Sequence, residues 1–270
     1  MKIKKKKILM LSGNLIKHKY VAIKLLKKYK SSRIIFEKYP KNVLQNYSNN
    51  KSNVLQNHFK NVQIYEKRYF QNFCNKNDSF LKKKIITSIK KGDINSLKVF
   101  KAIKKFKPSL IIVNATSIIN KRLVNHYTNK IVNIHQGLMP YYRGTGTNVW
   151  TFYNKELQYT GITVHFINEK IDDGNILSQV QSNFSINDNT HSIGCKNAKL
   201  SADLVKKVID FLIRNPNYKG KKLRSSKNKI FFKKDFNDKI VLKVNNLIKK
   251  GLVKKYLSKK TKKIKLINSI

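Results

Sequence analysis

The sequence predicts an α/β fold, a Rossmann-like, doubly wound and mostly parallel sheet, with a short basic and mainly helical C-terminal extension. Short, uninterrupted apolar runs at residues 8–11 and 110–113 are typical of strands that are buried on both faces. The chain opens in the order strand, helix, strand, which is the βαβ unit of a doubly wound sheet. At 270 residues it is long enough to bury one sizeable core.

The spacing of apolar residues along the chain predicts the individual helices and strands. Apolar or alternating runs predict strands at residues 8–11, 33–37, 110–113, 131–134, 159–168 and 230–232. Apolar residues at helical spacing predict helices at residues 18–28, 57–73, 80–90, 93–106, 120–127, 190–213 and 236–257. Pro108 and Pro216 each end a helix, because proline cannot continue one.

These elements group into one large domain, residues 1–215, and a basic extension, residues 216–270. Within the domain, residues 41–92 are rich in Asn, Lys and aromatic side chains and predict a helical excursion of unclear role. Basic residues strongly outnumber acidic ones in the extension, and we expect residues 258–270 to form a loose basic tail.

The net charge of +46 first suggests a nucleic acid or another anionic partner. Only six of the 59 basic residues are Arg, the side chain that binds phosphate in a bidentate manner. Because Asn and Ile are also abundant, compositional drift toward Lys explains most of the charge better than a selected polyanion site. We still expect the Lys-rich surface to bind nucleic acid weakly and in a salt-dependent way.

Cys74 and Cys195 are far apart in the sequence, and neither they nor the histidines show metal-ligand spacing, so no metal is expected. Buried thiols suit a reducing, cytoplasmic location. The basic N-terminus is followed by only four apolar residues, too few for a signal sequence, and no apolar run reaches the length of a membrane span. The oligomeric state is not indicated.

Residues 131–180 differ in composition from their surroundings. They carry three basic and four acidic side chains in a chain of net charge +46, and they include the single tryptophan, Trp150. Because this segment does not share the lysine excess of the rest of the chain, we expect a chemical function to constrain its residues. The turn Ser12-Gly13-Asn14 after the first strand, by contrast, lacks the several glycines of a dinucleotide-binding loop.

Three side chains in this segment suggest acyl-transfer chemistry. Asn133 and His135 stand two residues apart at the carboxyl end of a predicted strand, so they point the same way and lie where open α/β sheets bind ligands. Asp172 lies in the turn after the next predicted strand. An amide and an imidazole can donate to the oxygen that becomes negative when an amine attacks a carbonyl, and a carboxylate can orient the imidazole and relay the proton.

Each of these residues also has a purely structural interpretation. Asn133 could form a turn, His135 could bond to a backbone carbonyl, and Asp172 could belong to an ordinary Asp-Gly turn. Arg143 is either a solvated loop charge or an anchor for an anionic group. We expect His165 to have a structural or supporting role.

Two segments, VNIHQGLMPYYRG at residues 132–144 and TGITVHFINEKIDDGNIL at residues 160–177, carry a resemblance to a known family. In order and spacing they resemble the formyltransferases that use 10-formyltetrahydrofolate. Members of that family carry Asn-x-His-x-Ser-Leu-Leu-Pro-x-Tyr-Arg-Gly, then a Thr-Gly-x-Thr-x-His strand and an Asp-x-Gly loop. Residues 107–113 are similar to the family's Lys-Pro-Asp-Leu strand, and a weaker likeness from about residue 7 to residue 215 implies a Rossmann-like formyltransferase catalytic domain.

The resemblance implies that Asn133, His135 and Asp172 are the catalytic residues and that 10-formyltetrahydrofolate is the co-substrate. It also implies a folate pocket between the end of the sheet and the Asp-x-Gly loop, lined by Leu110, Ala115, Leu138, Met139, Asn168, Ile171 and Asp173. We expect the amine substrate to be held by Ser12, Gly13, Arg143 and Gly144.

Two departures from the family pattern bear on the substrate. Gly137 stands where the family has Ser, which leaves one loop hydrogen bond unaccounted for. Ser12-Gly13-Asn14 keeps only a fragment of the glycine-rich turn that holds the substrate phosphate in glycinamide ribonucleotide formyltransferases. The Tyr-Arg-Gly at residues 142–144 is more similar to methionyl-tRNA and amino-sugar formyltransferases.

These features favour N-formylation of a small-molecule primary amine, such as a nucleotide-linked amino sugar. One alternative is methionyl-tRNA formyltransferase, whose relatives add an OB-like barrel that residues 216–270 are expected to be too few and too helical to form. The others are glycinamide ribonucleotide formyltransferase and an inactive, basic RNA-binding protein on the same fold.

Overall fold

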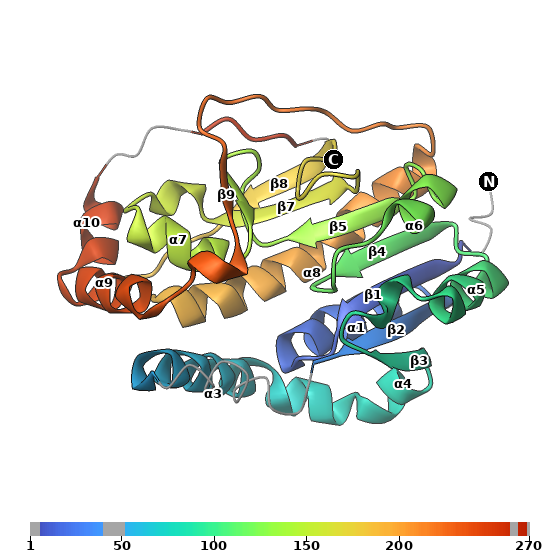
Figure 1. Cartoon of the computed structure of the whole chain (residues 1–270), viewed down its shortest axis with the longest axis horizontal. Helices are drawn as coiled ribbons and strands as arrows, with labels where there is room; N and C mark the ends of the chain where they lie inside the picture. The colour runs from blue at the N-terminus through green and yellow to red at the C-terminus, as the bar shows by residue number, and fades with distance from the viewer. Residues whose placement is uncertain (1–5, 40–51, 260–263, 269–270) are drawn as a thin grey trace.

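The protein was analysed as a computed structural model, which describes residues 6–39, 52–259 and 264–268 (Figure 1). Seven strands form one sheet in the order β3-β2-β1-β4-β5-β7-β8. Their bounds are β1 Ile8–Gly13, β2 Ser32–Lys38, β3 Ile85–Lys90, β4 Leu110–Asn114, β5 Ile131–His135, β7 Gly161–Phe166 and β8 Ile176–Gln181. All neighbouring strands from β3 to β5 are parallel, and β7 is antiparallel to both β5 and β8. The predicted fold class, an α/β fold with a mostly parallel sheet, is confirmed.

Helices cover both faces of this sheet. Their bounds are α1 Ile16–Lys28, α3 Asn53–Lys76, α4 Asp78–Lys82, α5 Leu97–Phe106, α6 Lys121–His126, α7 Thr147–Tyr153, α8 Thr190–Arg214, α9 Asp238–Lys249 and α10 Leu252–Ser258. Buried side chains of α1, α3 and α8 share a core cluster with Met10, Ile112 and Val132. Those of α5 and α6 share another with Leu11 and Val113. The two core clusters therefore lie on opposite faces of the sheet. Because neighbouring residues of a strand point to opposite faces, the cluster that a strand residue belongs to shows which face its polar neighbours occupy.

The predicted helix over residues 80–90 is wrong in its second half. Helix α4 ends at Lys82, and Ile85–Lys90 is β3, an edge strand beside β2. Four of its six residues are β-branched and its side chains alternate between half-buried and exposed, which suits an edge strand. The excursion of residues 41–92 therefore adds a strand to the main sheet; its residues 41–51 lie outside the described part.

Other elements differ from the prediction in their limits. The helix expected from residue 93 begins at Leu97, because the Ser96 side chain caps it by accepting from Val99 N. The helix expected over residues 236–257 is divided into α9 and α10 at Gly251, whose φ is 77°. Strand β8, helix α7 and the three-residue strand β6, Tyr142–Gly144, have no counterpart among the predicted elements.

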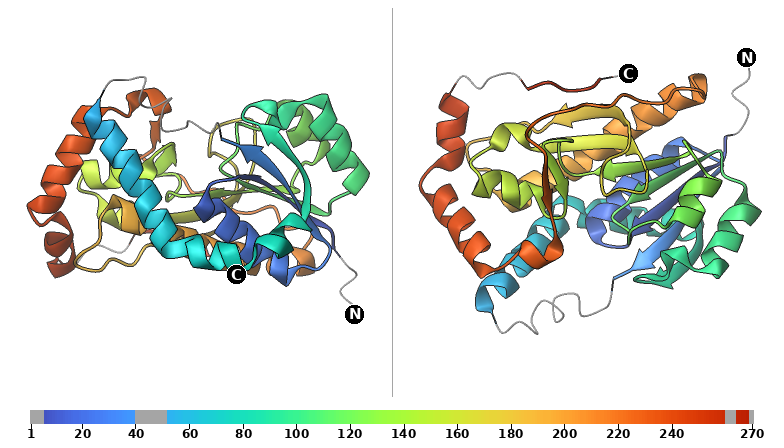
Figure 2. Two further views of the ribbon diagram at one scale, coloured as in Figure 1. Left: turned by 90° about the horizontal axis from the view of Figure 1, so that it is seen from below. Right: turned by 45° about the horizontal axis from the view of Figure 1, so that its top comes forward.

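The C-terminal extension packs against the rest of the molecule. Its strand β9, Lys229–Phe231, pairs in parallel with β6, and buried residues of α9 and α10 share a core cluster with Trp150 and Phe152 of α7. Figure 2 shows these two helices, in red, at the end of the molecule near α7 and α3. Within the described ranges, no helix combines the length and the apolar character needed to cross a bilayer.

The expectation of a loose C-terminal tail is wrong for residues 264–268. Ile267 is buried, and Gln179 N of β8 donates to Ile267 O at 2.8 Å. The Gln179 side chain in turn accepts from Ile267 N at 3.0 Å. Of the rest of that predicted tail, Ser258 ends α10 and Lys259 follows it, while residues 260–263 and 269–270 lie outside the described residues.

Candidate active site

Strands β5 and β7 bring four polar side chains onto one face of the sheet. Val132 and Ile134 of β5 point into the core beneath α1 and α8, so Asn133 and His135 between and after them point to the opposite face. In the antiparallel register, Asn133 lies opposite His165 and His135 lies opposite Thr163. Asn133 and His165, which are 32 positions apart in the sequence, are therefore neighbours on adjacent strands.

Asp172 joins this group from the loop between β7 and β8. It accepts from Asn133 Nδ2 at 3.2 Å and from the backbone N–H of Gly144 at 2.9 Å. Its carboxylate oxygens lie 3.3 Å from His135 Nδ1 and 3.5 Å from His165 Nε2. The structure thus brings Asn133, His135 and Asp172 together, as the sequence predicts, with His165 as a fourth member.

The electrostatics of the cluster favour a carboxylate at Asp172. Burial opposes its ionisation, but the His135 and His165 rings and the Gly144 N–H hold the pKa of Asp172 well below the ordinary aspartate value. His135 Nε2 lies 3.0 Å from the backbone oxygen of Tyr142. Both ring nitrogens of His135 therefore face oxygen acceptors, Tyr142 O and the Asp172 carboxylate.

The loop after β5 is held by Thr163, which lies beside His135. The Thr163 hydroxyl donates to Gly137 O at 2.6 Å and accepts from Met139 N at 3.0 Å. A Cβ atom at Gly137 would lie 2.4 Å from His135 Nε2. Glycine at this position therefore lets the His135 ring lie close against the loop backbone, whereas a side chain would force the ring to move.

Arg143 is not a solvated loop charge. Its side chain is buried and donates through Nε and Nη2 to Ile171 O at 3.1 and 2.7 Å. Its Nη1 donates to Asn228 Oδ1 at 3.1 Å and lies 3.5 Å from Asp173 Oδ1. The guanidinium therefore braces the loop that carries Asp172, a role that the sequence does not indicate; anchoring of an anionic substrate group by Arg143 stays a prediction.

A protein-family model described as "Formyl transferase" matches residues 41–209, which is more than half of the chain and includes the whole cluster. The chain belongs to the formyl transferase family. A curated relative, the methionyl-tRNA formyltransferase of Finegoldia magna, is 29% identical over 119 residues, which are 44% of this chain and 38% of the relative. The chain spans less than half the length of the first curated relatives it matches.

Solved structures of formyl transferases share the fold at low identity. The sugar N-formyltransferase from Shewanella sp FDAARGOS_354 has a TM-score of 0.57 at 20% identity and covers 88% of this chain and 87% of its own. The N-formyltransferase from Helicobacter canadensis, in complex with folinic acid and dTDP-3-aminofucose, has a TM-score of 0.55 at 21% identity. The match covers 87% of this chain and 78% of the Helicobacter chain.

Most of the residues that the formyl transferase resemblance assigns to the folate pocket lie around the cluster. Ala115, with a φ of 57°, follows the carboxyl end of β4, and Leu138 and Met139 are buried in the loop after β5. Asn168, Ile171 and Asp173 belong to the Asp172 loop, where Asn168 and Lys222 contact the Asp173 carboxylate. Leu110 lies apart from them, buried at the amino end of β4, and its contact with folate stays a prediction.

Ser12 and Gly13 lie at the carboxyl end of β1, which β4 separates from β5. Ser12 is fully buried and its hydroxyl donates to Gly13 O. Tyr39 covers this turn: its N–H donates to Asn14 Oδ1, and a Cβ atom at Gly13 would lie 2.8 Å from its ring. The structure therefore does not join Ser12 and Gly13 to the Asn133 cluster, and their contact with substrate stays a prediction. Gly144, by contrast, adjoins the cluster through its N–H.

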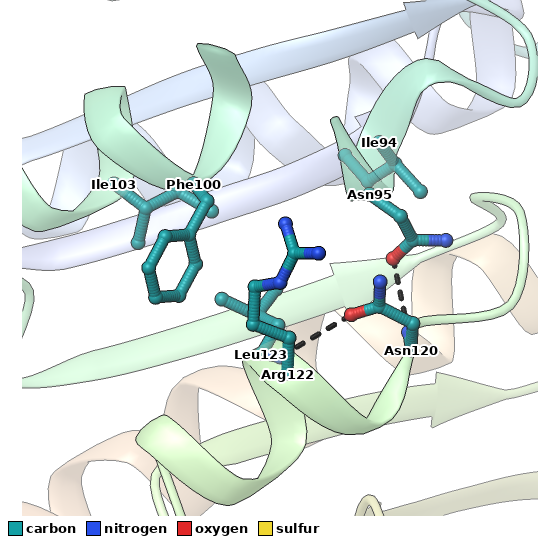
Figure 3. Close-up of a pocket in the computed structure, with 7 residues that line it drawn as sticks. All are labelled: Ile94, Asn95, Phe100, Ile103, Asn120, Arg122 and Leu123. Atoms are coloured by element: carbon teal, nitrogen blue, oxygen red, sulfur yellow. Dashed lines mark hydrogen bonds between the residues drawn. The ribbon is translucent and has the colours of Figure 1, made fainter. Parts of the chain in front are cut away.

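A separate depression lies between α5 and α6 and contains no member of the cluster (Figure 3). The side chains of Asn95 and Asn120 that line it already hydrogen-bond to the protein. Its lining residues are Ile94, Asn95, Phe100, Ile103, Asn120, Arg122 and Leu123. In the described part of the chain, no group of three His, Cys, Asp or Glu side chains is arranged to hold a metal ion.

Proposed function

We propose that this protein moves a formyl group from 10-formyltetrahydrofolate to a primary amine of a small molecule, such as a nucleotide-linked amino sugar. The observation that carries the proposal is the contact network of Asn133, His135 and Asp172 at the carboxyl rim of the sheet. Open α/β sheets bind their ligands at this rim. Membership of the formyl transferase family supports the reaction class.

Attack of an amine nitrogen on the formyl carbon places negative charge on the formyl oxygen. The His135 ring and the Asn133 amide are the donors that can stabilise this charge. Both ring nitrogens of His135 face protein oxygens, of Tyr142 and Asp172, so the formyl oxygen has to displace one of them to accept from the ring. The Asn133 amide nitrogen already donates to Asp172 Oδ1 at 3.2 Å and lies 3.1 Å from His165 Nε2. The formyl oxygen therefore has to take over one of these donors when the substrate binds.

Proton transfer completes the exchange. The attacking nitrogen loses a proton as its bond to the formyl carbon forms, and the folate nitrogen gains one as its bond to that carbon breaks. Asp172 is ionised and lies beside His135, so its carboxylate can accept the proton that the amine loses and also orients the His135 ring. No covalent enzyme intermediate is needed, because the formyl donor is already activated.

Two loops are suited to hold the folate. The loop after β4 contains Ala115 and the exposed Ile118, and the Asp172 loop contains Asn168 and Ile171. An ion pair of 2.9 Å connects Lys121, the first residue of α6, with Glu169 of the Asp172 loop. Folinic acid in the Helicobacter canadensis relative supports a folate in the same fold. The free, buried state of both cysteines supports a cytoplasmic location.

A second candidate is formylation of methionyl-tRNA, which the names of several curated relatives favour. The described part of residues 216–268 forms a short strand, a short 3-10 helix and two helices that pack on the core. Glycinamide ribonucleotide is less well supported, because the phosphate turn is fragmentary and Ser12 is buried. An inactive protein would use only its Lys-rich surface, which should bind RNA weakly.

The experiment is a panel of amines incubated with purified protein and 10-formyltetrahydrofolate, followed by mass spectrometry for a product that has gained one formyl group. The panel contains dTDP- and UDP-linked amino sugars, glycinamide ribonucleotide and charged initiator tRNA. We expect an amino-sugar nucleotide to be formylated. Formylation of only the tRNA would favour the second candidate, and no formylation of any amine would contradict the proposal.

Variants connect the activity to the cluster. Asn133→Ala and His135→Ala should each lower kcat by about 100-fold or more, the usual cost of removing an oxyanion donor. His126→Ala on α6 is the matched control, because His126 is exposed and lies outside the cluster. Loss of activity in all three variants, or in none, would show that the chemistry does not depend on this cluster.

A further inference from the structure

Strand β6 holds both ends of the His135–Asp172 pair. Its first residue, Tyr142, offers the backbone oxygen that contacts His135 Nε2 at 3.0 Å. Its last residue, Gly144, donates its N–H to Asp172 Oδ2 at 2.9 Å. Arg143 between them donates twice to Ile171 O, next to Asp172. A shift of this three-residue strand therefore alters a contact of the imidazole and a contact of the carboxylate.

The strand that pairs with β6 belongs to the C-terminal extension. In the parallel register, Tyr142 lies opposite Lys229 and Gly144 lies opposite Phe231. Thr145 N donates to Phe231 O at 2.8 Å. The two backbones approach so closely that a Cβ atom at Gly144 would lie 2.1 Å from Phe231 O. The extension is therefore in direct contact with the strand that frames the cluster.

Side chains strengthen this pairing. The Phe231 ring stacks on Trp150 at 4.5 Å and on Tyr142 at 5.5 Å between centroids. The Tyr142 hydroxyl donates to Glu156, which also forms an ion pair with Lys229 at 2.9 Å. The stacked rings and the ion pair fix the position of β9 relative to β6.

Asn228, the residue before β9, reaches the cluster most directly. It is exposed, and its Oδ1 accepts from Arg143 Nη1 at 3.1 Å. The opposite side of the same guanidinium holds Ile171 O. A single planar group thus connects residue 228 with the loop that presents Asp172, although 56 positions separate residues 172 and 228 in the chain.

We propose that Asn228 and strand β9 are positioning elements for formyl transfer: they set the distance between His135 and Asp172 through Arg143 and β6. This inference rests on the proposed function, and it gives the C-terminal extension a part in the reaction beyond its contribution to the core. Asn228 touches no substrate; its effect passes through the guanidinium.

The test compares three variants of the full-length protein in the formyl transfer assay. Asn228→Ala removes the acceptor from Arg143 and should lower kcat roughly 10- to 100-fold, the scale expected for a misplacement of reacting groups by up to about 1 Å. KM for both substrates should change less than kcat, because Asn228 itself touches neither substrate. Asn228→Asp keeps an oxygen acceptor for Arg143 and should restore kcat. Asn245→Ala, at an exposed position on α9 in the same extension, is the matched control and should behave as wild type.

Hydrogen–deuterium exchange gives a second measurement that does not depend on activity. Asn228→Ala should accelerate exchange in peptides covering residues 142–146 and 168–174, and Asn245→Ala should not. Wild-type kcat and wild-type exchange in Asn228→Ala would overturn the proposal, as would failure of Asn228→Asp to restore kcat. If the wild-type protein formylates no amine, the proposed function falls, and the exchange data alone decide whether residue 228 orders the Asp172 loop.

Discussion

Replacing Thr163 by Val tests whether the loop after β5 is held by one hydroxyl. The Thr163 side chain is fully buried and makes three hydrogen bonds: it donates to Gly137 O and accepts from Met139 N and from Gln179 Nε2. Valine has the same shape and no hydroxyl, so Gly137 O and Met139 N lose this partner inside the protein. Gln179 Nε2 keeps its bond to Met139 O at 2.7 Å.

The magnitude follows from these two orphaned groups. A buried polar group left without a partner costs about 1–3 kcal/mol, and the added methyl group offsets about 1 kcal/mol. For two such groups the free energy of unfolding should therefore fall by roughly 1–5 kcal/mol in Thr163→Val. Thr163→Ser keeps the hydroxyl and loses one methyl group, which should cost only about 1 kcal/mol.

Urea unfolding measures both variants, with Thr128→Val as the control for a hydroxyl on the exposed surface. The midpoint should shift in Thr163→Val with an unchanged m-value, and the control should lie within about 0.5 kcal/mol of wild type. If Thr163→Val were as stable as Thr163→Ser, the three hydrogen bonds would not hold the loop and the reasoning would be refuted.

Three further predictions test other parts of the structure. Gly144→Ala should lower the free energy of unfolding by at least about 2 kcal/mol and reduce activity, because the residue has a φ of 86° and its new Cβ would meet Phe231 O; an unchanged Tm would contradict the close approach. Burial opposes ionisation of Asp172, but the two nearby histidine rings and a backbone N–H hold its pKa below the ordinary value of 3.8. Its charge therefore stabilises the fold fully above about pH 5, and this contribution is lost as the pH falls toward the folded pKa. In urea titrations the advantage of wild type over Asp172→Asn should thus shrink below pH 4; an advantage independent of pH would exclude the charge as its source. Burial raises the pKa of Cys74 to about 11 and that of Cys195 to about 12, so both thiols should react slowly with a disulfide reagent at pH 8 and rapidly after addition of guanidinium; fast reaction of the native protein would be inconsistent with their burial.

The cluster could be anticipated from the sequence because its geometry follows from strand period. Asn133 and His135 are two residues apart on a strand, so their side chains share a face whatever the surrounding packing. Asp172 follows an adjacent strand in the sheet, and a short Asp-Asp-Gly turn brings it back to the rim. These local rules, together with uninterrupted apolar runs for the buried strands, also predict the central part of the sheet.

The remaining features depend on contacts between distant residues. Strands β6 and β9 have three residues each, too few to show any period, and their pairing joins Gly144 to Phe231. The buried position of Arg143 depends on Ile171 and Asn228, which lie far from it in the chain. β3 is similarly ambiguous, because a six-residue run with lysine nearby fits a helix as well as an edge strand until its neighbour in the sheet is known.

The most direct test of the account is a crystal structure of the complex with 5-formyltetrahydrofolate, a stable formyl-bearing folate. We expect its formyl oxygen within hydrogen-bonding distance of Asn133 Nδ2 and the His135 ring, with the pterin between the loop after β4 and the Asp172 loop. A folate bound elsewhere, with Asn133 and His135 keeping all their contacts to the protein, would contradict the assignment of this cluster as the site of formyl transfer.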